Sequence, residues 1–235
     1  MTLPKKYLSL ILIIICLTGI CNNCNASSTK GYIITQNQDT LYGKIRLPWL
    51  STSIDFFNFF GFDFESFFYH LSFKSDADKS YKTYYPTMIS GFGFKHRSTN
   101  YIFKSYNLNY KSIFEDKTKG YRFINLIHHG KIDLYRHMIS INYPVTCPNS
   151  ANRGQVMKYY EYYICSDGTN LLWVGSKKQY KTLIELLQLC HVDDECLRRI
   201  PENADFKDIW NVLTEYDKWL LEKKTLVTRD KKLMK

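Results

Sequence analysis

Short aromatic and β-branched runs, separated by turn-forming residues, fill the chain from Gly31 to Val174. Runs of this kind are typical of antiparallel strands joined by hairpins. The pattern predicts hairpins at residues 32–45, 68–84, 121–138 and 159–174, a further strand at 89–94 and an exposed loop at 142–157. Gly130 and Gly168 fall in the turns of the last two hairpins, where we expect them to supply the positive φ that tight turns need.

The hydrophobic period changes after Gly175. Apolar residues then recur at helical spacing, first at Leu183, Leu187 and Cys190 and again after Ile209. A short third helix is expected near 193–197. The predicted fold class is therefore α+β: a mainly antiparallel, hairpin-rich β-sheet, sandwich-like or half-barrel-like, followed by C-terminal amphipathic helices.

One stretch, residues 54–68, contains eight phenylalanines, and their spacing does not decide between a helix and a strand. Burial in the core is the commoner fate of phenylalanine, and we expect it for most of this cluster. If exposed, the cluster would contact a membrane or a partner protein. The candidate contact residues are Phe59, Phe60, Phe62 and Phe64.

The N-terminus has the pattern of a signal peptide. Lys5 and Lys6 precede an apolar run at residues 8–20, and Cys24 and Ala26 are small residues at the −3 and −1 positions of a cleavage site. The run is shorter than the roughly 20 apolar residues that span a bilayer. We therefore expect a signal peptide at 1–26 and a mature protein that is exported to the periplasm or the cell envelope.

A lipid anchor at Cys21 or Cys24 is the less favoured alternative. Lipoprotein signals place a small residue directly before the modified cysteine, whereas Ile20 and Asn23 stand there in this chain.

Removing 26 of the 235 residues leaves 209, which is enough for one domain with a substantial core. A hydrophobic content of 45% and an aromatic content of 16% exclude a disordered chain. We expect a single β-rich domain with C-terminal helices at 27–222, which includes a Phe-rich insertion at 46–67, and a basic tail at 223–235.

Four cysteines follow the signal segment, and an even number in an oxidising compartment predicts disulfides. Proximity in the sequence favours Cys190–Cys196 and Cys147–Cys165 over the two other pairings. A zinc site at Cys190 and Cys196 is disfavoured because the spacing is not CxxC and no second pair matches it.

The formal net charge of +10 becomes +8 when Lys5 and Lys6 leave with the signal segment. The lysines of the middle of the chain, such as Lys74 and Lys95, stand singly and are interpreted as a solvated face. Nucleic-acid binders concentrate their charge in one stripe, so we expect no nucleic-acid partner. The expected partners are an envelope protein, a glycan or a membrane surface.

Candidate chemistry is sparse. His128 and His129 are adjacent in a turn, and neighbouring side chains that point apart are poorly placed to share one metal ion. No GxSxG, HExxH or phosphate-binding glycine loop is present in the sequence. We expect no catalytic residue, metal or cofactor, and a non-enzymatic binding or structural module. The alternative is a secreted, hydrolase-like enzyme whose site is assembled from dispersed residues.

The Tyr-rich strand near residue 160 is a candidate binding surface. Alternation places Tyr160 and Tyr162 on one face of the strand, and Tyr159, Glu161 and Tyr163 on the other. The strand could offer an aromatic platform to a sugar or a protein, or its rings could serve only cross-strand packing.

Several phrases of the chain resemble a family of uncharacterised exported proteins of Gram-negative bacteria. The phrases are Gly31-Tyr32-Ile33-Ile34-Thr35, Asp39-Thr40-Leu41-Tyr42-Gly43-Lys44-Ile45, Ile89-Ser90-Gly91-Phe92-Gly93 and Gly130-Lys131-Ile132-Asp133-Leu134-Tyr135. They occur in the family's order, although Gln38 replaces a usual glycine and residues 46–67 look inserted. The resemblance implies a periplasmic or envelope-facing β-rich domain, and it implies no activity.

Overall fold

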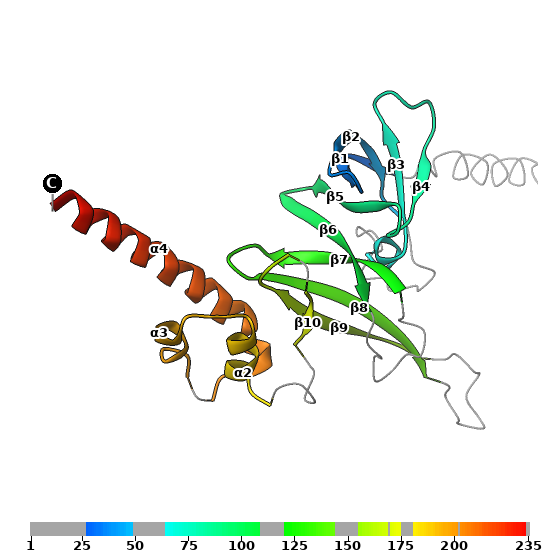
Figure 1. Cartoon of the computed structure of the whole chain (residues 1–235). Coiled ribbons are helices and arrows are strands. Elements are labelled where there is room, and N and C mark those ends of the chain that lie inside the picture. Colours follow the sequence, from blue (N-terminus) through cyan, green and yellow to red (C-terminus); the bar gives the residue numbers. More distant parts are fainter. Residues whose placement is uncertain are drawn as a thin grey trace, which may run out of the picture.

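A computed structural model describes residues 27–48, 64–108, 120–143, 155–168, 170–174, 181–201 and 203–233. Its centre is one antiparallel sheet of ten strands in the order β10-β9-β8-β7-β6-β5-β1-β2-β3-β4 (Figure 1). The strands are β1 (Ser28–Thr35), β2 (Thr40–Arg46), β3 (Leu71–Ser75), β4 (Lys82–Tyr84), β5 (Ile89–His96), β6 (Thr99–Leu108), β7 (Gly120–His128), β8 (Asp133–Tyr143), β9 (Gln155–Cys165) and β10 (Leu172–Trp173). The predicted α+β class is confirmed, with one twisted sheet in place of two packed sheets.

All four expected hairpins are present. The first joins β1 to β2 through a turn in which Gln38 has a φ of 67° and its N–H donates to the Thr35 carbonyl at 3.1 Å. The last joins β9 to β10, and there Gly168 has the expected positive φ, 79°. The sequence analysis did not define β6, and it took the ends of β8 and β9 for loop.

The expectation that Gly130 has a positive φ was wrong. Among the described glycines only Gly120 and Gly168 have positive φ. Gly130 instead lies against helix α4, where an added Cβ would overlap the carboxylate of Asp217. A side chain at this position would require the Asp217 carboxylate to move.

The helices follow the sheet, as the period change predicted. They are α2 (Leu183–Leu189), α3 (Asp194–Leu197) and α4 (Ile209–Leu233), with short 3₁₀ helices η2 (Glu65–Phe68) and η3 (Phe206–Asp208). The side chains of Thr182 and Asp193 cap α2 and α3, and Asp205 forms a capping box with Asp208. Helix α4 continues to Leu233, so the residues expected to be a solvated tail from 223 onward extend the last helix.

The described residues form two large hydrophobic cores. The first, here called the aromatic core, is built from phenylalanines of β3, β5, β6 and β7 beneath η2; its members include Phe67, Phe68, Phe73, Phe92, Phe94, Phe103 and Phe123. The second, here called the helical core, joins β8 and β9 to the helices; its members include Leu134, Ile164, Leu183, Leu186, Leu187, Ile209 and Leu213.

Part of the phenylalanine cluster can now be placed. Phe67 and Phe68 are buried in the aromatic core. Phe64 is half-buried, with its ring centroid 4.9 Å from that of Tyr101, so this candidate contact residue packs against the core. Phe59, Phe60 and Phe62 lie outside the described residues. Burial is confirmed for the C-terminal part of the cluster.

The structure does not form the expected Cys190–Cys196 bond. Both cysteines are free thiols buried among the apolar residues of the helical core. Cys165 is also a buried free thiol, and its expected partner Cys147 lies outside the described residues. The two thiols of the first pair contribute to the core as small hydrophobic side chains.

Candidate functional site

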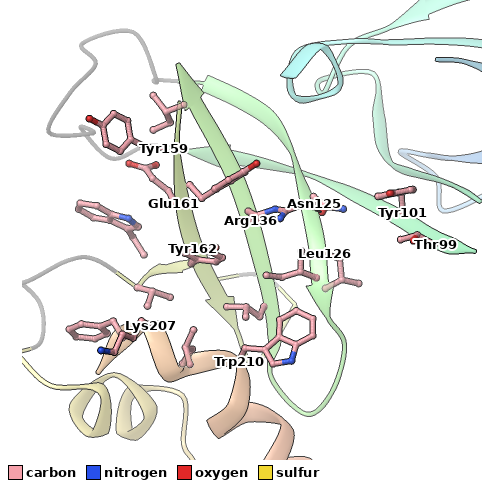
Figure 2. Close-up of a pocket in the computed structure, with 18 of the residues that line it drawn as sticks. Thr99, Tyr101, Asn125, Leu126, Arg136, Tyr159, Glu161, Tyr162, Lys207 and Trp210 are labelled. Carbon is pink, nitrogen blue, oxygen red and sulfur yellow. Dashed lines mark hydrogen bonds between the residues drawn. The ribbon is translucent and has the colours of Figure 1, made fainter. Parts of the chain in front are cut away.

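A groove of about 810 Å³ lies between the sheet and the start of α4, and it is here called the sheet–helix groove (Figure 2). Aromatic and aliphatic side chains make up most of its walls, and polar groups, which include the carboxylate of Glu161, lie among them. Its lining includes Tyr101, Asn125, Arg136, Tyr160, Tyr162, Trp173, Lys207 and Trp210. An aromatic groove with few convergent polar groups is the usual form of a small-ligand site.

Strand register brings the polar groups of the groove together. Asn125 pairs with Arg136 across β7 and β8, and Arg136 pairs with Tyr162 across β8 and β9. Tyr160 is opposite Met138, two residues further along. Cross-strand partners share a face, so all four groove residues lie on one face of the sheet, as expected for Tyr160 and Tyr162.

The groove lies between the two cores on this face. Leu134, Arg136 and Met138 are alternate residues of β8, so their side chains lie on the same face of the sheet. Leu134 belongs to the helical core and Met138 to the aromatic core. Arg136 therefore occupies the strip that neither η2 nor the helices cover.

Neighbouring groups hold the guanidinium of Arg136 in place. Its Nη2 donates to Asn125 Oδ1 at 3.4 Å, and its Cζ lies 4.9 Å from the centre of the exposed Tyr160 ring. Asn125 is only 3% exposed and is fixed in turn because its Nδ2 donates to the Ile102 carbonyl. Arg136 Nε is buried and has no hydrogen-bond partner in the described structure. A positioned guanidinium with unused donors is suited to bind a carboxylate or a phosphate.

A contact between hairpin and helix positions the opposite wall. Asp217 of α4 accepts hydrogen bonds from His128 Nε2 at 2.9 Å and from the Lys131 backbone N–H at 3.0 Å. The His128 ring also lies 5.9 Å from the Trp210 ring. These contacts, here called the Asp217 clamp, fix the first turns of α4 and with them Trp210 at the groove (Figure 2).

The two adjacent histidines do not act together. His128 binds Asp217, whereas His129 Nδ1 lies 2.7 Å from Asp133 Oδ1. This agrees with the expected divergence of neighbouring side chains. No group of His, Cys, Asp and Glu suited to hold a metal ion occurs in the described ranges.

Asp133 is the centre of a buried polar network. Lys104 Nζ donates to it at 3.1 Å and the Tyr135 hydroxyl at 2.9 Å, and Tyr106 donates to Tyr135 at 3.2 Å. Burial opposes ionisation of Asp133, but the hydrogen bonds from His129, Tyr135 and Lys104 outweigh it and lower the pKa of the carboxyl group. The network therefore holds a carboxylate inside the sheet.

The network lacks an activated nucleophile. Cys165 is opposite Asp133 across β8 and β9. Burial raises the pKa of the Cys165 thiol, and burial also raises that of Tyr106 to about 12. A catalytic cysteine needs a lowered pKa. Burial therefore disfavours the thiolate form of Cys165 beside this network.

His137 is a second buried polar group of β8. It is 1% exposed, its two ring nitrogens have no partner among the described residues, and its ring lies edge-on to Phe68 at 4.8 Å. Burial, helped by the charge of Arg122, lowers the pKa of His137 to about 4. The imidazole is therefore neutral at physiological pH.

The groove residues Asn125 and Arg136 escaped the sequence analysis because they belong to no motif. The Tyr-rich strand was recognised, and pairing β8 with it in register would have placed Arg136 beside Tyr162. In the part of the chain that the structure describes, no helix is both long and apolar enough to cross a membrane. Comparisons of the chain with protein-family models, with curated proteins and with solved structures found no match.

Proposed function

We propose that this chain is an exported, non-enzymatic binding domain of the cell envelope that holds an acidic sugar in the sheet–helix groove. The observation that carries the proposal is the guanidinium of Arg136, which Asn125 and Tyr160 hold among aromatic walls. A guanidinium binds a carboxylate through two parallel hydrogen bonds. The rings of Tyr160, Tyr162 and Trp210 offer flat apolar surfaces to the C–H faces of a sugar.

Export rests on the sequence. The basic and apolar segments at 1–26 have the pattern of a cleaved signal, and the likeness to a family of exported Gram-negative proteins supports the same location. Cell fractionation, followed by N-terminal sequencing of the mature protein, tests this. We expect periplasmic or envelope-bound protein that begins near Ser27, and full-length protein in the cytoplasm would contradict export.

Tryptophan fluorescence gives a direct test of binding, because Trp173 and Trp210 line the groove. We expect a trimer of galacturonate to change the emission in a saturable way, and a trimer of glucose to bind at least tenfold more weakly. Arg136→Gln should weaken binding of the acidic trimer by about 10-fold or more, since a hydrogen bond to a charged group contributes about 1.5–3 kcal/mol. Equal binding by Arg136→Gln and wild type would refute the proposal.

A matched pair of tyrosine variants tests the aromatic wall. Tyr160 and Tyr85 are each 52% exposed, but only Tyr160 lines the groove. Tyr160→Ala should weaken binding severalfold, and Tyr85→Ala should not change it. Chromatography of the trimer after incubation should show it intact, whereas cleaved sugar would favour the alternative of a secreted hydrolase.

A further inference from the structure

Four lysines that are far apart in the sequence form a row across the other end of the sheet. Lys30 of β1 pairs directly with Lys44 of β2, and Lys44 pairs with Lys74 of β3. In the antiparallel pair of β5 and β1, Phe94 is opposite Gly31. Lys95, the next residue of β5, is therefore opposite Lys30. The order β5-β1-β2-β3 in the sheet makes this a continuous row, here called the lysine row.

The lysines that stand singly in the sequence are neighbours in this row. Cross-strand partners share a face, so the four ammonium groups project on the same side, spaced by roughly 5 Å from strand to strand. None of the four is in an ion pair within the described residues. A cleft beside the row contains one carboxylate, that of Asp76. Like charges directly opposite one another destabilise a sheet, so the row carries a cost that the fold itself does not offset.

A shallow cleft and two tyrosines adjoin the row. Lys30, Lys44 and Lys95 line a cleft of about 620 Å³ together with Tyr32 and Tyr42. Tyr42 is 67% exposed, and its ring centroid lies 6.2 Å from that of Tyr32. An exposed tyrosine beside lysines is characteristic of the boundary between water and lipid head groups, where the ring has an apolar body and a polar tip.

The lysine row and the sheet–helix groove use opposite faces of the sheet. Phe92 pairs with Phe103 and Phe103 pairs with Asn125, so Phe92 shares the face of the groove. Lys95 is three residues from Phe92 and therefore projects on the other face. Occupation of one site leaves the other open.

We propose that the lysine row docks this protein on an anionic lipid leaflet, with phosphate groups of the lipids between the lysines and the rings of Tyr32 and Tyr42 at head-group depth. Charge complementarity carries the inference: an uncompensated row of cations matches a surface of closely spaced phosphates, and each lysine near such a surface adds to the affinity. The site is independent of the sugar proposed for the groove.

Co-sedimentation with vesicles tests the inference. The wild-type protein should bind vesicles that contain 30% phosphatidylglycerol and remain unbound with pure phosphatidylcholine. Binding should fall steeply when the salt concentration rises from 0.1 to 1 M, because the screening length shrinks from about 10 to about 3 Å. The double variant Lys30→Gln/Lys44→Gln should lower the partition coefficient by about tenfold or more.

A control variant separates position from total charge. Lys131→Gln/Lys181→Gln removes the same charge at exposed positions away from the row and should change the partition coefficient by less than threefold. The row variant should keep or raise the melting temperature, since it removes two opposed cations. Equal losses in the two double variants, or an unchanged row variant, would overturn the proposal.

A soluble polyanion distinguishes a lipid surface from phosphate in general. Inositol hexakisphosphate should displace the protein from the vesicles only at concentrations far above that of the accessible lipid phosphate. If the protein binds this compound tightly and does not bind the vesicles, the row is a site for a soluble phosphate ligand and the lipid proposal is wrong.

Discussion

The aromatic core and the helical core lie on the same face of one sheet, and they are built from different elements and side chains. Over β3 to β7 the cover is η2, a single turn that inserts Phe67 and Phe68 among other phenylalanines. Over β8 and β9 the cover is three α-helices, whose leucines and isoleucines pack on Leu134 and Ile164. Each buried phenylalanine removes more surface from water than a smaller aliphatic residue, and among the described residues a shorter segment covers the aromatic core than the helical core.

The boundary between the two covers is where the candidate site lies. Rings packed at η2 and aliphatic residues packed beneath the helices leave a strip of β7, β8 and β9 between them. Asn125, Arg136 and Tyr162 occupy that strip in consecutive strands. The groove lies on this strip, between the residues of the two cores.

The largest effect that we predict is in the aromatic core. Phe67 is 1% exposed and its ring lies 5.3–5.7 Å from those of Phe92, Phe94 and Phe103. Phe67→Ala should lower the free energy of unfolding by about 3–5 kcal/mol, since it removes contacts and leaves a cavity beneath a short cover. Urea denaturation followed by circular dichroism measures this change.

Phe64→Ala provides the graded comparison. Phe64 is only half-buried at the edge of the same core, so we expect a loss of about 1–2 kcal/mol. If Phe67→Ala and Phe64→Ala lower the free energy of unfolding equally, then Phe67 is not more deeply buried than Phe64.

Much of this fold could be predicted from the sequence because local signals were strong. Alternating apolar residues and turn-forming residues indicated the hairpins, and Gly168 supplied the positive φ that its turn required. Strand β6 was missed, since no strong turn signal sets Thr99 apart from the strand before it. The reason for Gly130 was also missed, because the close approach of Asp217 depends on contacts 87 residues apart.

The candidate sites were less predictable, because they depend on which residues face one another across neighbouring strands. Arg136 and Asn125 carry no motif, and their neighbourhood depends on the register of β7, β8 and β9. The same is true of Lys30, Lys44 and Lys74, which stand singly in the sequence and side by side in the sheet. The hydrophobic pattern and the turn geometry set the register, and no motif marks the polar residues that it places opposite one another.

The second prediction concerns a polar residue buried near the aromatic core. The pKa of His137 is lowered to about 4 by burial and by the nearby Arg122 charge, whereas an unfolded histidine titrates near 6.5. Between these two pKa values the histidine binds a proton in the unfolded chain but not in the folded chain. The free energy of unfolding should therefore fall by about 2–3 kcal/mol as the pH drops from 6.5 to 4.

His137→Leu should remove this part of the acid sensitivity. At pH 7 the variant should be as stable as wild type or more stable, because leucine leaves no unpartnered nitrogen in the interior. Denaturation curves at several pH values test the prediction. A variant that loses as much stability as wild type between pH 6.5 and 4 would show that His137 is not buried as a neutral group.

The last prediction concerns the connection between the helical core and the sheet. Asp217→Ala removes the hydrogen bonds to His128 and to the Lys131 N–H, and with them the Asp217 clamp. The free energy of unfolding should fall by about 1–2 kcal/mol. Glu215→Ala is the matched control, because Glu215 is exposed on the same helix and pairs only with Lys218 in the described structure. An exposed pair of this kind contributes about 0–1 kcal/mol, so the control should lose less than half as much.

The Asp217 clamp also positions a wall of the groove. Its loss should therefore affect ligand binding as well as stability. His128 joins Asp217 on one side and lies beside Trp210 on the other. Loss of the clamp should therefore broaden and red-shift the tryptophan emission and weaken binding of the acidic trimer, while the control Glu215→Ala, which lies outside the groove, should leave both unchanged. If Asp217→Ala lowers stability without affecting either measurement, the start of α4 is held by the apolar contacts of Ile209 and Leu213 alone, and the groove does not depend on the clamp.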